Sequence, residues 1–440
     1  MKINFSFLII LFVAIVTFIN DIILYCFHLN YIVSLVISFA LVLLITLFFI
    51  KSKKLILENY FDKIDLIFLI GFFIFTVIKI VVPDYYFDVV TYHYYKQEYY
   101  FTDSINFDFL PSGGSINDFV YPLGDRMNYI FRFLLGLRLG TIVSYFAAIV
   151  IFYEVKKILK FYKKDLKVWV QVLAGICSLF IPIIYRYIGS YDIDVFSTVF
   201  LLECFYIGIS KKDMFNTKKY LYYWFLISGI SVGIKISNFV LIIPIGVLII
   251  INNIKDFKNL KITDYFISIL LFFLPFFIYG ISNFVQAGNF FYPFLGREKF
   301  YDIEKGWNDP NWGIPNIWYS FIWPIWIAFF SRAGHDEEFL HEWIWAVGYI
   351  FLLIDIFKRC FKKEIKNDLF KQEWITLICC ILWAIFMNGF CRYASIIPVL
   401  FIIAILADVE FSAERKFKLI SIAKIALLIL ITFVSMQYRR

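Results

Sequence analysis

Long runs of apolar residues recur along the whole 440-residue chain, with clear examples at 5–25, 32–50, 64–82 and 168–185. Their lengths match the roughly 20 residues that a helix needs to cross about 30 Å of hydrocarbon. In lipid only helices and closed barrels satisfy the backbone, and these runs lack the polar–apolar alternation of barrel strands. Together with an apolar content of 62%, they predict an all-α, polytopic integral membrane protein.

Basic residues cluster in short segments between the apolar runs, which explains the net charge of +8 without a nucleic-acid partner. Basic segments between membrane spans face the cytoplasm. These segments are 51–54, 156–167, 211–219, 255–261 and 358–366. By contrast, 83–126 holds seven carboxylates against only Lys96 and Arg126, and we expect it on the outer face.

Together, these constraints predict about thirteen crossings, with the N-terminus inside. They lie near 5–25, 30–50, 64–82, 127–153, 168–186, 192–210, 220–234, 236–252, 264–282, 343–357, 373–388, 393–409 and 418–436. The pair 220–234 and 236–252 is short for two crossings, so a re-entrant hairpin is an alternative. The orientation of the C-terminus stays open, because Arg439 and Arg440 would lie outside.

The chain is predicted to form one transmembrane domain, 1–440, with external loops at about 83–126 and 283–316. The Trp-rich segment 317–330 is predicted to be an interfacial or re-entrant helix, since another crossing there would reverse the later basic segments. Its expected anchors are Trp318, Trp323 and Trp326.

Cysteine and histidine spacing predicts neither a metal site nor a cofactor. The seven Cys lie mostly inside apolar runs, without the spacing of a disulfide framework or zinc knuckle. The cluster from His335 to Glu342 matches no zinc-helix motif and is interpreted as a solvated polar loop.

The acidic external segment opens with a carboxylate and an imidazole five residues apart, Asp88 and His93. On a helix this spacing lets both side chains point into one cavity. Asp88 is a candidate general base, because partial desolvation near lipid raises the proton affinity of a carboxylate. In the alternative interpretation, Asp84 and Asp88 cap a loop helix and His93 is an interfacial polar residue.

Two further carboxylates, Asp192 and Asp194, stand at the start of a predicted span and are candidate catalytic acids. The alternative is a helix N-cap with a second acid placed favourably in the helix dipole.

Three cations are candidate ligands for a lipid phosphate. Lys235 lies between two apolar stretches, where a lysine needs an anionic partner or a route to water, and snorkelling is the alternative. Arg392 lies in a short external turn and can bind two oxygens at once. Arg126, in the acidic external segment, is the third.

Four segments in this order resemble motifs of the GT-C superfamily of polytopic glycosyltransferases, especially the bacterial members related to protein O-mannosyltransferases and lipid A aminoarabinose transferases. They are the acidic loop motif 87–93, the Gly-rich turn with lysine at 229–237, the external motif 283–294, and Arg392–Tyr393 leading into Pro398. In the third motif, Phe290 stands where proline is usual.

The resemblance implies a GT-C-like architecture and transfer of a sugar from a polyprenyl-phosphate donor, with inversion, to a glycan, lipid or protein acceptor. The reaction would take place at the outer face of a bacterial cytoplasmic membrane. It also implies that Asp88 is the base, with Asp192 or Asp194 as a second acid, and that Lys235 and Arg392 hold the lipid phosphate. A polysaccharide polymerase or ligase of the cell envelope is the nearest alternative, and a transporter or flippase is the alternative from a different class.

Overall fold

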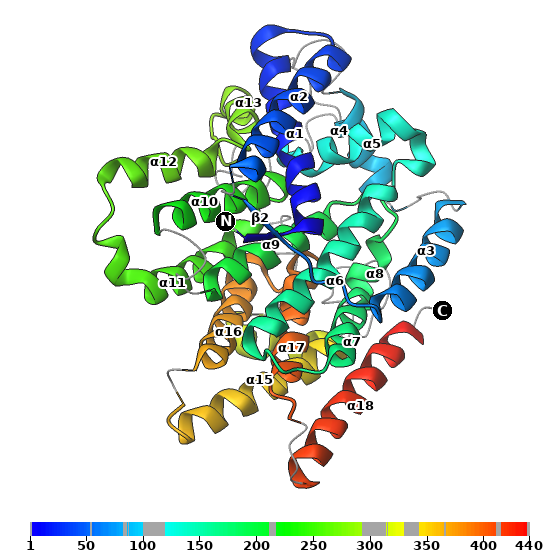
Figure 1. The fold of residues 1–440 in the computed structure, drawn as a ribbon, viewed down its shortest axis with the longest axis vertical. Coiled ribbons are helices and arrows are strands. Elements are labelled where there is room, and N and C mark those ends of the chain that lie inside the picture. The colour runs from blue at the N-terminus through cyan, green and yellow to red at the C-terminus, as the bar shows by residue number, and fades with distance from the viewer. Residues whose placement is uncertain are drawn as a thin grey trace.

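The protein is nearly all α-helical, as the apolar runs predict (Figure 1). The computed structural model describes residues 2–52, 55–81, 86, 88–99, 119–210, 217–292, 314, 316–329, 343–364, 367–410 and 415–437. Within them, the short strands β1 (Lys2–Asn4) and β2 (Ile56–Glu58) pair in parallel. The predicted helical class is therefore confirmed.

Most neighbouring helices are separated by only a few residues. Up to the middle of the chain they are α1 (Phe5–Phe27), α2 (Tyr31–Lys51), α3 (Asp65–Val81), the π-helical turn η1 (Val89–His93), α4 (Tyr94–Tyr99), α5 (Leu123–Leu139), α6 (Ile142–Tyr162), α7 (Val168–Leu179), α8 (Pro182–Tyr187) and α9 (Asp194–Ile209). The remainder are α10 (Thr217–Ile234), α11 (Asn238–Phe257), α12 (Ile262–Phe273), α13 (Phe277–Ala287), the 3-10 turn η6 (Ile317–Phe321), α14 (Trp323–Phe329), α15 (Trp343–Phe361), α16 (Asp368–Met387), the 3-10 turn η8 (Cys391–Ala394), α17 (Ile396–Ala407) and α18 (Arg415–Gln437).

The core is built around two helices, α9 and α17, in which every residue is buried. Helix α9 packs against α6, α10 and α11, and α17 packs against α15, α16 and α7. Helices α2, α3, α12 and α18 lie at the periphery (Figure 1) and expose apolar side chains such as Phe73, Ile262 and Leu430. Exposed apolar surface of this extent marks contact with a membrane or a partner.

Three described helices, α1, α2 and α16, are long and apolar enough to cross a membrane. The number rises to five if the bent pairs α5–α6 and α12–α13 each form one span. This is consistent with an integral membrane protein, whereas the predicted count of about thirteen crossings is not confirmed.

Helix breaks account for part of the difference in span count. The predicted crossing 127–153 is divided between α5 and α6, which bend by 110°, and Gly136 within α5 has a left-handed φ of 80°. Glycine adopts this conformation without the steric cost of a side chain. The predicted crossing 168–186 is divided between α7 and α8, with Pro182 in the first turn of α8.

The predicted helix at 317–330 is found as η6 and α14, but its tryptophans differ in environment. Trp318 is 77% exposed, whereas Trp323 is fully buried and donates a hydrogen bond from Nε1 to the Cys380 carbonyl at 2.7 Å. The prediction that Trp323 anchors the segment at the membrane interface is therefore wrong, because its indole N–H is satisfied inside the protein.

Candidate functional site

Arg392 binds three carboxylates that are far from it in sequence. It lies in η8, between α16 and α17, and its Nη1 contacts Asp88. Its Nη2 lies 2.6 Å from Asp192 Oδ2, and its Nε lies 3.2 Å from Asp194 Oδ2. The planar fork of a guanidinium suits such multiple binding. We call Asp88, Asp192, Asp194, Lys235 and Arg392 the Arg392 cluster.

Lys235 joins the cluster from the turn between α10 and α11. Its Nζ contacts Asp194 Oδ1 and lies 3.5 Å from the centre of the Tyr393 ring. The side chain is buried, so it is paired inside the protein rather than extended to the surface. Burial is the largest influence on the pKa of Lys235 and lowers it, and Asp194 opposes this shift without cancelling it.

The Gly-rich segment before Lys235 is explained by close packing of α10 on α12. A Cβ atom on Gly229 would lie 2.1 Å from the carbonyl oxygen of Phe272. Only glycine permits that approach, so this part of the motif has a structural role beside Lys235.

Asp88 is the most open acid of the cluster. Its side chain is 20% exposed, against 1% for that of Asp192. It makes no capping hydrogen bond to η1, so the described contacts do not support the capping interpretation for Asp88. Burial would raise the pKa of Asp88, but the neighbouring Arg392 and His93 charges outweigh it and lower that pKa.

Asp192 contacts both the start of α9 and Arg392. Its Oδ1 accepts a hydrogen bond from the Asp194 backbone N–H at 2.9 Å, and its Oδ2 contacts Arg392. The N-cap position of α9 is held by Ile193, which makes no side-chain capping hydrogen bond. Asp192 is therefore not the N-cap that the alternative interpretation expects.

His93 is buried beside the cluster rather than lying at an interface. Its Nδ1 lies 2.5 Å from Asp125 Oδ1, and its Nε2 lies 3.9 Å from Asp192 Oδ2. His93 therefore connects a fourth carboxylate to the Arg392 cluster.

Arg126 joins a different cluster. Its Nε lies 3.1 Å from both carboxylate oxygens of Asp21 on α1, which also accepts a hydrogen bond from Tyr279 on α13. These contacts tie α1, α5 and α13 together. The role of Arg126 as a phosphate ligand stays a prediction.

Parts of the predicted site lie outside the described residues. They include Asp84, most of the external loop 83–126, the segment 293–313 and the cluster from His335 to Glu342. Among the residues that are described, no group of three or more His, Cys, Asp and Glu side chains is placed to hold a metal ion.

The sequence did not single out Asp125 or Tyr187, and Tyr393 stood out only as part of the motif that begins at Arg392. The Arg392 guanidinium lies 4.8 Å from the centre of the Tyr187 ring and 5.5 Å from that of Tyr393, so aromatic faces cover a cation already bound by carboxylates. No local pattern marks Asp125 or Tyr187, because Asp125 meets His93 across 32 positions and Tyr187 meets Arg392 only in the folded chain.

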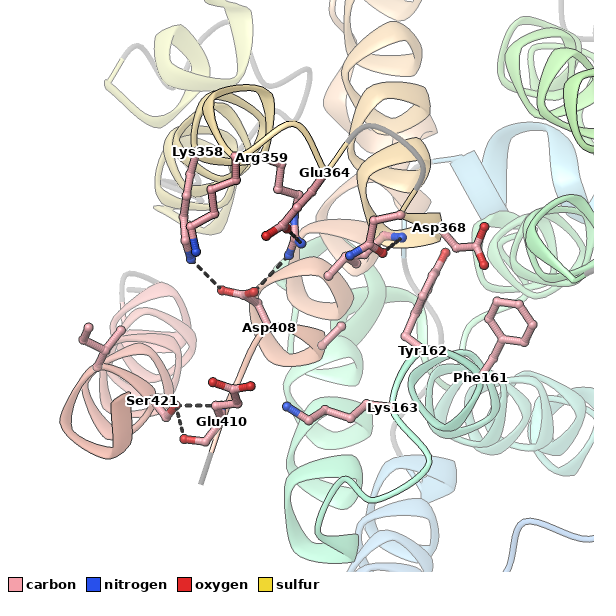
Figure 2. A pocket seen from close by; sticks show the side chains of 15 residues that line it. Phe161, Tyr162, Lys163, Lys358, Arg359, Glu364, Asp368, Asp408, Glu410 and Ser421 are labelled. Carbon is pink, nitrogen blue, oxygen red and sulfur yellow. Dashed lines mark hydrogen bonds and ion pairs between the residues drawn. The ribbon is translucent and has the colours of Figure 1, made fainter. Parts of the chain in front are cut away.

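A second group of charges surrounds a cavity of about 600 Å³ at the other ends of α16 and α17 (Figure 2). Arg359 on α15 lies 3.0 Å from Glu373, 3.2 Å from Glu364 and 2.9 Å from Asp408. Lys424 on α18 also contacts Asp408, at 2.9 Å. We call these five residues the Arg359 cluster. The 20 residues of α16 separate it from Arg392 by about 30 Å along the helix.

The chain matches no family model, and neither a curated protein nor a solved structure is significantly similar to it.

Proposed function

We propose that this protein is a membrane glycosyltransferase of GT-C-like architecture. It transfers a sugar from a polyprenyl-phosphate donor to a glycan, lipid or protein acceptor at the outer face of a bacterial cytoplasmic membrane. The observation that carries the proposal is the convergence of Asp88, Lys235 and Arg392. The sequence predicts that these three residues lie in separate external turns. In the structure, Arg392 contacts Asp88 directly, and Asp194 lies between Arg392 and Lys235 and contacts both.

The placement of the two clusters supports the proposed orientation. The Arg392 cluster lies where α10 and α16 end and α9 and α17 begin. The Arg359 cluster lies at the opposite end of α16, beside the basic segment 358–366. If α16 crosses the membrane, the basic segment lies inside and the Arg392 cluster lies outside, as the positive-inside rule requires.

In the proposed reaction, the acceptor hydroxyl oxygen attacks the anomeric carbon of the donor sugar, and the bond from that carbon to the phosphate oxygen breaks. Asp88 accepts the hydroxyl proton, and Lys235 and Arg392 stabilise the negative charge that develops on the leaving phosphate. When the phosphate occupies Arg392, Asp88 loses its partner. Its pKa then rises, which makes it a stronger base when the donor is in place.

Replacing Asp88 with Asn tests this role. General-base assistance contributes about 10²- to 10⁴-fold in rate, so Asp88→Asn should lower transfer of labelled sugar in reconstituted membranes by that factor. Donor binding, measured separately, should persist. The matched control is Asp368→Asn, which removes a similarly exposed aspartate that pairs with Lys371 at the other end of α16. Equal transfer by wild type and Asp88→Asn would remove Asp88 from catalysis.

One observation favours a transporter or flippase instead: Lys235 and Asp194 form a buried ion pair between helix ends, an arrangement that also occurs on ion pathways. Reconstituted vesicles distinguish the two functions. A transporter would move a labelled lipid-linked sugar across the bilayer and leave its phosphate bond intact. A glycosyltransferase would break that bond.

A further inference from the structure

The ring of His93 lies between two carboxylates but contacts only one of them closely. Asp125 holds Nδ1 at 2.5 Å, whereas Nε2 is 3.9 Å from Asp192 Oδ2. The side chain is only 2% exposed, and no atom among the described residues forms a hydrogen bond with Nε2.

The separation of 3.9 Å is too long for a direct hydrogen bond, which spans about 2.7–3.2 Å. A buried polar nitrogen without a partner is costly, and gaps of this size are commonly bridged by an oxygen from water or a ligand. The position of Nε2 therefore calls for an oxygen that the described residues do not supply within hydrogen-bond distance.

Charged groups on several neighbouring elements act on the His93 ring. They are Asp125 on α5, Asp192 before α9, Asp88 before η1 and Lys96 on α4. Burial would lower the pKa of His93, but Asp125 and then Asp192 outweigh it, and the net shift is upward despite Lys96. A raised pKa favours the cationic form of the ring, in which Nε2 carries a proton to donate.

We propose that His93, held in place by Asp125, is a third cationic ligand for the leaving phosphate of the donor. The inference rests on the proposed function. Its geometric basis is that Nε2 of His93 and Nη2 of Arg392 both face the same oxygen of Asp192. A phosphate beside Asp192 can therefore accept hydrogen bonds from both. Asp125 is a positioning residue, because it acts on the phosphate only through His93.

The test measures binding of a polyprenyl phosphodiester to the full-length protein in lipid nanodiscs as a function of pH. The phosphodiester keeps one negative charge through the neutral range, so a change in affinity reports on the protein. As pH rises through the pKa of His93, the ring loses its charge and wild-type affinity should fall. At pH values below the pKa of His93, His93→Gln should bind the phosphodiester about 10- to 100-fold more weakly than wild type, since it lacks one charged hydrogen bond. Its affinity should no longer fall as pH rises through that pKa.

Asp125→Asn separates positioning from a merely structural role. Without the Asp125 charge, the pKa of His93 falls, so the midpoint of the affinity step should move about 1–3 pH units lower. Nitrogen-15 NMR of labelled histidine measures the same titration without any ligand. The chain has only four His, and the His93→Gln spectrum identifies the His93 signals.

An unchanged midpoint in Asp125→Asn, or a neutral His93 ring at pH 7 in wild type, would overturn the inference. A polyprenyl alcohol without the phosphate is the reference ligand. If the protein preferred the phosphodiester to the alcohol but its affinity did not fall with pH, His93 would not be a phosphate ligand, and the proposed function would be unaffected. Equal binding of the alcohol and the phosphodiester would reject the proposed function itself.

Discussion

Arg392 and Arg359 lie at opposite ends of α16, and each binds three carboxylates. The two clusters differ in the elements that carry them. In the Arg359 cluster, Arg359, Glu373 and Lys424 lie on α15, α16 and α18, while Glu364 and Asp408 follow the ends of α15 and α17. The buried Arg359–Glu373 pair joins α15 directly to α16. In the Arg392 cluster, most of the charged residues lie in turns between helices.

This difference separates a structural network from a candidate site. Charges carried by turns can adjust when a ligand arrives, whereas charges fixed along packed helices hold the helices in register. Counting ion pairs would not distinguish the two clusters.

The largest contrast is expected from replacing each arginine with lysine. Arg392→Lys keeps the positive charge but lacks the planar guanidinium, which binds several oxygens at once. Sugar transfer should therefore fall by about 10²- to 10³-fold. The melting temperature should change little. Arg359→Lys should leave transfer per folded molecule near the wild-type value. An equal loss of transfer in both variants would show that the two clusters are not functionally distinct.

The next effect concerns stability. Arg359→Ala leaves the fully buried Glu373 carboxylate without its partner, and breaking such a buried pair costs about 3–5 kcal/mol of unfolding free energy. Denaturant unfolding in detergent measures the loss. The double variant Arg359→Ala/Glu373→Gln is the control, because it removes the stranded charge and should recover part of the stability. No recovery would mean that the loss came from packing alone.

The sequence predicted the helices well because apolar runs are a local signal. Runs such as 5–25 and 30–50 correspond to α1 and α2, and both helices begin after an asparagine whose side chain caps the first turn, Asn4 and Asn30. Span counting was less successful, because run length does not register a helix break. Gly136 bends one predicted span, and Pro182 starts a new helix within another.

The candidate site likewise contains residues that a local sequence signal identified and contacts that no local signal predicts. Asp88, Lys235 and Arg392 were identifiable because a charge at the edge of an apolar run stands out locally. Their mutual contacts, and the part played by Asp125, depend on tertiary packing between segments separated by up to 304 positions. A single sequence carries no signal of that kind.

The smallest expected effect tests whether the buried ion pairs of the Arg359 cluster contribute more to the unfolding free energy than the exposed one. Lys358 is 48% exposed and lies 3.6 Å from Asp408, which already contacts Arg359 and Lys424 at 2.9 Å each. Exposed ion pairs contribute about 0–1 kcal/mol and weaken as salt screens them. Lys358→Ala should therefore lower the unfolding free energy by less than about 1 kcal/mol, and by less still in high salt.

Lys424→Ala is the matched comparison. It removes a buried lysine that also lies 3.5 Å from Asp355, so two carboxylates lose a partner, and the loss should exceed that of Lys358→Ala. Equal losses would mean that burial does not determine how much each ion pair of this cluster contributes to the unfolding free energy. The Arg359→Ala effect would then have to come from the shape of the guanidinium in its pocket rather than from the charge it neutralises.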